Sequence, residues 1–248
     1  MSAARASSLL GALGGDDLSA VLGAARVVRH VRREVVLRRA DDAALVVLRG
    51  AAKEHRTNLD GLQVLTNVLG PGDVGGLTTA LGYPGGNDVT ALERFEGLVL
   101  RGRDLRDLAA SRPPVAQACL RTVTEQYADL HERSVAFAGT STTRRIVHRL
   151  LELATRWGQP VDGVVMVRLH LTQEELASWA GVSRESLAKV LGELRRAHIL
   201  HTGRRELIIR DLSALQARQR SNGTAASVID VLLADAGSDE PRTAGQRR

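Results

Sequence analysis

The chain has 248 residues, of which 44% are hydrophobic and 25% charged, as is typical of soluble globular proteins. Lysine and arginine outnumber the acidic residues 34 to 28, and the resulting net charge of +6 is compatible with a polyanionic partner. No apolar run reaches the ~18 residues of a membrane span, and no signal-peptide pattern opens the chain. The single cysteine, Cys119, excludes an intramolecular disulfide and a cysteine-rich metal site. We therefore expect a soluble cytoplasmic protein with no membrane partner.

Residues 26–101 show the pattern of a β domain. Short aliphatic segments lie at residues 34–37, 44–48 and 62–65. Turn residues separate them at 41–42, 49–50, 60–61 and 70–73. Many short strands at this spacing predict an antiparallel barrel or sandwich. The glycine-rich stretch 82–88 interrupts the strands and predicts a loop.

A long helix is predicted from Pro113, because proline fits the first turn of a helix. Along it, small or apolar residues recur at alternating steps of four and three: Ala116, Leu120, Val123, Tyr127, Leu130, Ser134 and Phe137. This heptad spacing is typical of a two-stranded coiled coil. The alternative is a helix that packs only on its own domain, but the polar flanking residues favour a projecting helix. We therefore predict a homodimer whose interface contains Leu120, Val123, Tyr127, Leu130 and Phe137.

The region after this helix predicts a change of domain. Residues 139–141 combine a helix break with a new N-cap, and a second amphipathic helix is expected over 142–157. A strand is expected over 164–169. The polar residues 216–248 are interpreted as a largely disordered tail.

The segment 171–194 has the features of a helix-turn-helix in the correct order. Thr172 with Glu175 three residues later is a capping box that begins a helix. Gly181 suits a turn with positive φ, and Ser183 caps the second helix. The inner side of that helix is apolar, and its outer side carries Arg184, Glu185, Ser186 and Lys189. An ordinary pair of antiparallel helices is the alternative, but it does not require this combination.

Residues 199–209 predict a β-hairpin, or wing, around a glycine turn with cationic residues at its tip. Between residues 183 and 210 there are seven Lys/Arg and three acidic residues, a local net charge of +4. A charge run is often only a solvated helix face. Here the charges accompany a helix and a wing, and this arrangement favours phosphate contacts.

On these motifs, residues 26–215 resemble the cyclic-AMP receptor protein/FNR family of bacterial transcription regulators, most specifically at residues 171–210. The resemblance implies that Arg184, Glu185 and Lys189 read base edges of double-stranded DNA in the major groove. It implies phosphate contacts from five further residues: Thr172, Ser183, Ser186, Gly203 and Arg204. It also places residues 158–163 where some members contact RNA polymerase.

The β domain departs from this family at the expected nucleotide pocket. Cyclic-nucleotide members hold the phosphate with a Gly-Glu pair and an Arg-Ser pair, whereas this chain has glycine pairs at 75–76 and 85–86. A buried anion needs a charge or several donors, so we expect no binding of cyclic AMP in the usual manner. The candidate pocket for another effector contains Gly75, Gly76, Gly85, Gly86, Asn87 and His131.

The sequence thus predicts an α+β fold with three parts. These are an antiparallel β-barrel domain of the cyclic-nucleotide-binding type over residues 1–112, a dimerisation helix over 113–138 and a winged helix-turn-helix domain over 139–215. We expect a dimeric transcription regulator that reads a palindromic operator. A receptor for a different small effector, such as a larger nucleotide, is a second and compatible hypothesis. No nucleophile–base pair, metal cluster or phosphate loop occurs, so we expect neither an enzyme nor a cofactor.

Overall fold

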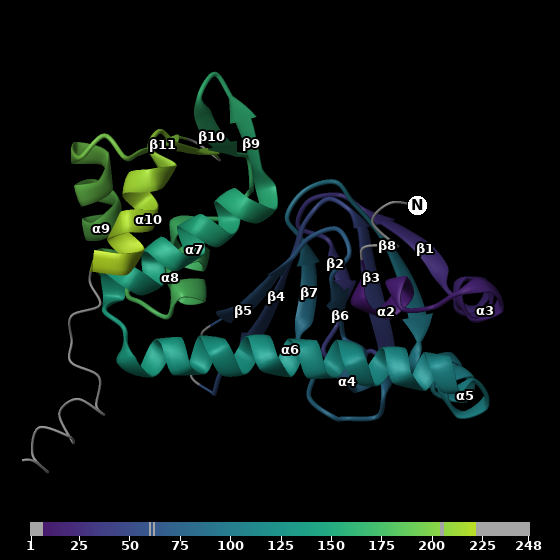
Figure 1. The fold of residues 1–248 in the computed structure, drawn as a ribbon. Coiled ribbons are helices and arrows are strands. Elements are labelled where there is room, and N and C mark those ends of the chain that lie inside the picture. The colour runs from purple at the N-terminus through teal and green to yellow at the C-terminus, as the bar shows by residue number, and fades with distance from the viewer. Residues whose placement is uncertain (1–6, 60, 62, 204–205, 222–248) are drawn as a thin grey trace, which may run out of the picture.

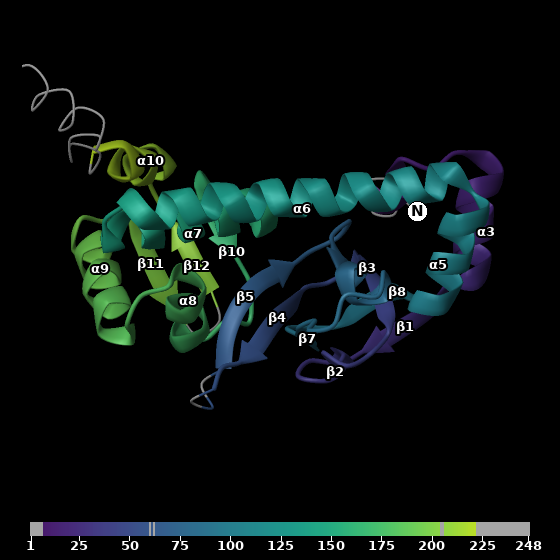
Figure 2. The ribbon, with the colours of Figure 1, turned by 90° about the horizontal axis from the view of Figure 1, so that it is seen from below.

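The computed structural model describes residues 7–59, 61, 63–203 and 206–221 and has the α+β architecture that the sequence predicts. Two antiparallel sheets form the N-terminal part of the molecule (Figure 1). A 27-residue helix runs along them, and a second domain of helices and a small sheet lies at its C-terminal end (Figures 1 and 2).

The N-terminal domain is built from two four-stranded sheets. The first has the order β1 (Arg26–His30), β8 (Phe95–Arg101), β3 (Ala43–Arg49), β6 (Val74–Gly75). The second has the order β2 (Val35–Leu37), β7 (Asp88–Ala91), β4 (Ala52–Thr57), β5 (Gln63–Leu69). The sheets stay separate and form a sandwich, where the sequence analysis predicted a barrel domain. Strand β4 was not predicted, and the strand expected to end at residue 65 continues to Leu69.

Strand β3 of the first sheet has buried residues on both of its faces, and its sequence is therefore almost continuously apolar. Leu45 and Val47 point into the core between the two sheets, where they pack with Phe95 and other residues of both sheets. Ala44 and Val46 point to the opposite face and belong to a second core. Because successive side chains of a strand point to opposite faces, both registers of β3 must be apolar.

Short helices form that second core against the outer face of the first sheet. They are α2 (Ser8–Gly11), α3 (Gly15–Ala24), α4 (Leu77–Ala80) and α5 (Gly102–Ser111). The N-terminal part of the long helix α6 (Pro113–Gly139) joins them through Val115, Ala118 and Cys119, which are buried. Burial also raises the pKa of the Cys119 thiol, so this cysteine is a core residue in its neutral form.

Helix α7 (Thr142–Trp157) has the predicted bounds, and Ser141 is its N-cap, since its side chain accepts a hydrogen bond from the Arg144 backbone N–H. The chain then forms the hairpin of β9 (Gly158–Val161) and β10 (Val164–Val167), which is paired by four residues a side. This hairpin projects on the side of the molecule opposite α6 (Figure 1). Strand β10 is two residues shorter than predicted.

The C-terminal domain has the order of a winged helix-turn-helix. It contains α8 (Gln173–Ala180), α9 (Arg184–Arg196), β11 (Leu200–Gly203), β12 (Glu206–Ile209) and α10 (Leu212–Ser221), and its sheet has the order β11-β12-β10-β9. Helix α10 continues past residue 215, where the domain was predicted to end and a disordered tail to begin; its Leu215 is fully buried. Residues 222–248 of the predicted tail lie outside the described residues.

Candidate nucleic-acid interface

Helix α8 begins with the capping box that the sequence predicts. The Thr172 backbone N–H donates to Glu175 Oε2 over 2.7 Å, and the Glu175 N–H donates to Thr172 Oγ1 over 3.1 Å. Gly181 ends the helix with φ 60°, in the left-handed region that glycine adopts without steric cost. The turn at Gly181 therefore sets the angle between α8 and α9, and the residues of the turn itself determine that angle.

Helix α9 presents one apolar and one polar side. Leu187, Val190, Leu191 and Leu194 are buried against α7 and α8. Arg184, Glu185 and Lys189, the three predicted base readers, are exposed on the other side. Hydrogen bonds from its own backbone N–H and from the Ser183 hydroxyl lower the pKa of Glu185, so its carboxylate is ionised and able to accept from a base amino group. The polar side can therefore offer both donors and an acceptor.

Two of the predicted phosphate contacts lie at the N-terminus of α9. Ser183 Oγ accepts from the Ser186 N–H over 3.1 Å, and the two hydroxyl oxygens also lie 3.1 Å apart. Gly203 is exposed at the end of β11. Arg204 and Arg205 lie outside the described residues. Thr172 is exposed but lies at the start of α8, beside side chains of the sandwich such as Lys53 and His55.

The position of α9 in the molecule leaves its polar side accessible. In both views it lies on the outer edge of the molecule at the C-terminal end of α6 (Figures 1 and 2). A rod-like partner could therefore approach α9 without meeting the sandwich.

The predicted seam of α6 is exposed. Leu120, Tyr127 and Leu130 are 68%, 67% and 61% accessible, although each is a large apolar or aromatic residue. Among the described side chains of this helix, the buried ones lie in its N-terminal half and are Val115, Ala118, Cys119 and Thr122. Further along, Gln126 is exposed and its Nε2 donates to the Val74 carbonyl of the sandwich over 2.7 Å. Val123 is half-buried, and the side chain of Phe137 lies outside the described residues. Three of the predicted interface residues thus form one exposed apolar strip.

A cavity of about 390 Å³ lies between the second sheet, the loop after α4 and helix α6. Four residues of the predicted pocket line it: Gly76, Gly85, Gly86 and Asn87. Gly75 is buried, and a Cβ there would press on Leu69 and Glu54. His131 stacks on Tyr127 on the exposed side of α6, and it does not line the cavity.

The cavity wall also contains residues that the sequence analysis missed. Glu54 comes from the unpredicted strand β4, while Gln126 and Asp129 come from α6. Among the described residues of this wall, two carry negative charge and none is a lysine or arginine. The guanidinium of Arg56 lies near Gly85 but outside this wall. The sequence could not predict that Glu54, Gln126 and Asp129 share one wall, because this depends on how β4 and α6 pack together.

Comparisons with known proteins agree with this geometry. Residues 144–218 match the family model described as a Crp-like helix-turn-helix domain. The chain is 27% identical over 180 residues to a protein of Mycobacterium tuberculosis described as a CRP-like cAMP-activated global transcriptional regulator; the match covers 72% of this chain and 80% of that protein.

Solved structures show the same fold. A CRP/FNR-family transcriptional regulator of Thermus thermophilus matches with a TM-score of 0.68 and 22% identity, over 80% of this chain and all of that one. The c-di-GMP responsive global regulator of Xanthomonas campestris matches with a TM-score of 0.66 and 19% identity, over 78% of this chain and 97% of that one.

Proposed function

The chain belongs to the CRP/FNR family of DNA-binding transcription regulators, and we propose that it acts as a homodimer that reads a palindromic operator. The observation that carries the proposal is the placement of two exposed surfaces. Helix α6, which carries the exposed apolar strip, runs toward the end of the molecule at which α9 lies (Figure 2), and the polar residues of α9 are exposed there. Pairing two copies of α6 in parallel about a two-fold axis would therefore bring both α9 helices to the same end.

The base contacts proposed for α9 follow from its N-terminal residues. Arg184 can donate two hydrogen bonds to guanine O6 and N7, and Glu185 can accept from a cytosine amino group. Lys189 lies one turn further along the exposed side and acts as a point charge, so it discriminates less than an arginine fork. The proposed phosphate contacts fix the register of the helix in the groove, and they are Thr172, Ser183, Ser186, Gly203 and Arg204.

A binding-site selection from random DNA tests the proposal directly. A two-fold dimer should select a palindrome whose half-sites are about 34 Å apart, one turn of the double helix. If the purified protein selects no palindrome, the proposed function is wrong.

A second function, reception of a small effector, is favoured by the cavity beside α6. Its wall combines apolar side chains such as Tyr127 and Leu130 with several hydrogen-bonding groups, as in typical small-molecule sites. Since Tyr127 and Leu130 also belong to the proposed dimer seam, an effector here would touch the dimer interface. A larger nucleotide remains the proposed effector; its phosphates would have to lie away from Glu54 and Asp129, on the side of the loop 82–87.

We expect no saturable binding of cyclic AMP at micromolar concentration. The described wall of the cavity holds Glu54 and Asp129 but no lysine or arginine, so a cyclic phosphate placed against it would meet negative charge, with Arg56 outside the wall near Gly85. Isothermal titration calorimetry is the measurement, with the M. tuberculosis relative described as cAMP-activated as the positive control. DNA binding should also occur without cyclic AMP; a complex with the selected palindrome that forms only after its addition would contradict this prediction.

Two further expectations accompany the proposal. The β9–β10 hairpin is the proposed contact for RNA polymerase, because it projects away from α6 and from α9 (Figure 1). The site of action is proposed to be the cytoplasm. None of the described helices is long and apolar enough to cross a bilayer.

A further inference from the structure

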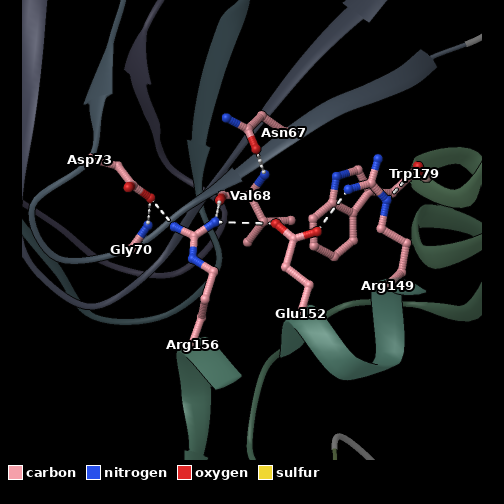
Figure 3. A network of polar contacts seen from close by, with 8 residues as sticks. All are labelled: Asn67, Val68, Gly70, Asp73, Arg149, Glu152, Arg156 and Trp179. Atoms are coloured by element: carbon pink, nitrogen blue, oxygen red, sulfur yellow. Dashed lines mark hydrogen bonds and ion pairs between the residues drawn. The ribbon is translucent and has the colours of Figure 1, made fainter. Parts of the chain in front are cut away.

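A polar network joins the sandwich to the DNA-binding domain, and its centre is Arg156 near the end of α7 (Figure 3). One guanidinium nitrogen of Arg156 donates to the Val68 carbonyl over 3.0 Å, and the other forms an ion pair with Asp73. Asp73 Oδ2 also accepts from the Gly70 N–H over 2.7 Å, so the carboxylate is held by its own turn. The guanidinium lies 4.4 Å from the Trp157 ring centroid. The Arg156 side chain is thus held by Val68 and Asp73 of the sandwich and by the Trp157 ring of its own helix.

The network continues from Arg156 into the helix-turn-helix (Figure 3). Glu152 bridges two arginines, with one oxygen 3.4 Å from Arg156 and the other 2.7 Å from Arg149. Arg149 is 5% exposed, donates to the Trp179 carbonyl over 3.2 Å and lies 4.5 Å from the centroid of that ring. Trp179 belongs to α8. The turn between β5 and β6 is therefore connected, group by group, to the first helix of the DNA-binding motif.

A second contact fixes α8 on strands β4 and β5. Lys53 Nζ lies 2.6 Å from Glu175 Oε1, and the Leu65 N–H donates to Ser178 Oγ over 2.9 Å. Burial alone would raise the pKa of Glu175, but the hydrogen bonds from Lys53 and Thr172 lower it below its usual range. The Glu175 carboxylate that faces Lys53 is therefore ionised at neutral pH.

Apolar packing between the domains surrounds these polar contacts. Leu65 and Val68 of β5 belong to the same core as Leu150, Trp179 and Leu187 of the DNA-binding domain. The hydrophobic driving force is itself non-directional, so this packing holds the two domains together but selects their angle less sharply than directional contacts do. Hydrogen bonds and ion pairs have preferred geometries, and they can select one angle.

We infer that Arg156 and Asp73 are positioning residues, whose ion pair sets the orientation of the DNA-binding domain on the sandwich. The inference rests on the proposed function. Helix α9 packs on α7 and α8 through buried residues, so whatever fixes α7 and α8 on the sandwich also fixes α9 relative to α6. In a dimer paired through α6, that orientation determines the distance between the two recognition helices. The pair thereby sets the operator spacing that the dimer accepts, with no effector required.

The test compares Asp73→Asn, Arg156→Gln and the double variant with the parent protein. Each is titrated with the selected palindrome and with palindromes one base pair longer or shorter at the centre. The measured quantity is the ratio of the affinity for the selected palindrome to the affinity for the longer or shorter ones. In each single variant we expect this ratio to be about tenfold lower than in the parent, which is an ordinary size for a coupling between sites. The double variant should lose little more than Arg156→Gln alone, because that single variant already lacks the ion pair with Asp73. Asp73→Glu should retain the preference.

Arg103→Gln is the matched control. Arg103 lies on α5, and its pair with Asp107 is largely exposed, so the same substitution should leave the spacing preference unchanged. Arg156→Lys keeps the positive charge and replaces Arg156→Gln in the test if that variant does not fold. The spacing preference of Arg156→Lys should fall measurably, but by less than tenfold. Folded dimers of Asp73→Asn or Arg156→Lys with unchanged spacing preference would overturn the inference, as would additive losses in the double variant. A parent protein that selects no palindrome would instead refute the proposed function.

Discussion

Replacing both Tyr127 and Leu130 by aspartate should convert the protein from a dimer into a monomer. Both side chains are more than 60% exposed on the strip of α6 that we propose to be the dimer interface. Each buried apolar side chain that is lost costs about 1.5 kcal/mol or more, and two-fold symmetry removes four of them. The total of about 6 kcal/mol corresponds to about a 10⁴-fold increase in the dimer dissociation constant, before charge repulsion is added. Light scattering at micromolar concentration measures the change.

The variant Arg121→Gln with Ala128→Asp is the matched control for this experiment. Both positions are exposed on α6 outside the seam, and the pair of substitutions changes the net charge by the same two units. It should remain dimeric. A Tyr127→Asp and Leu130→Asp protein that also remains dimeric would place the interface elsewhere and contradict the coiled-coil assignment.

The elements of the DNA-binding domain could be predicted from the sequence because their signals are local. A capping box lies within four residues, and the apolar spacing of a helix repeats within two turns. Ser141, Thr172, Gly181 and Ser183 accordingly occupy the predicted structural positions. Residues 216–221 were assigned to the tail because they are mostly polar, whereas the structure continues α10 through them from the buried Leu215.

Strand β4 was missed because its sequence, Ala52–Thr57, lacks the aliphatic pattern of its neighbours. It is nevertheless paired on both sides, with β5 and with β7, and the ladder holds its polar residues in place. The ion pair between Arg156 and Asp73 joins residues 83 positions apart. Such contacts depend on tertiary packing, and a single sequence contains no local signal for them.

The largest change in sequence recognition is expected from Arg184→Ala. Arg184 is exposed at the first position of α9, next to the second proposed base reader, Glu185, whose pKa is lowered by local hydrogen bonds. Loss of a bidentate contact to guanine should cost about 1–3 kcal/mol per half-site and should relax the preference at one base pair. Binding-site selection by the variant and the parent, at the same salt concentration, measures both effects.

Arg196→Ala provides the control because it removes the same charge from the opposite end of the same helix, where Arg196 is also exposed. If Arg196 contacts DNA, it contacts phosphate, and phosphate carries no sequence information. Its removal should lower the salt dependence of binding by at most about one unit of slope per subunit and leave the selected sequence unchanged. A selected sequence that is the same for Arg184→Ala as for the parent would show that Arg184 does not read a base, and the docking proposed for α9 would then be wrong.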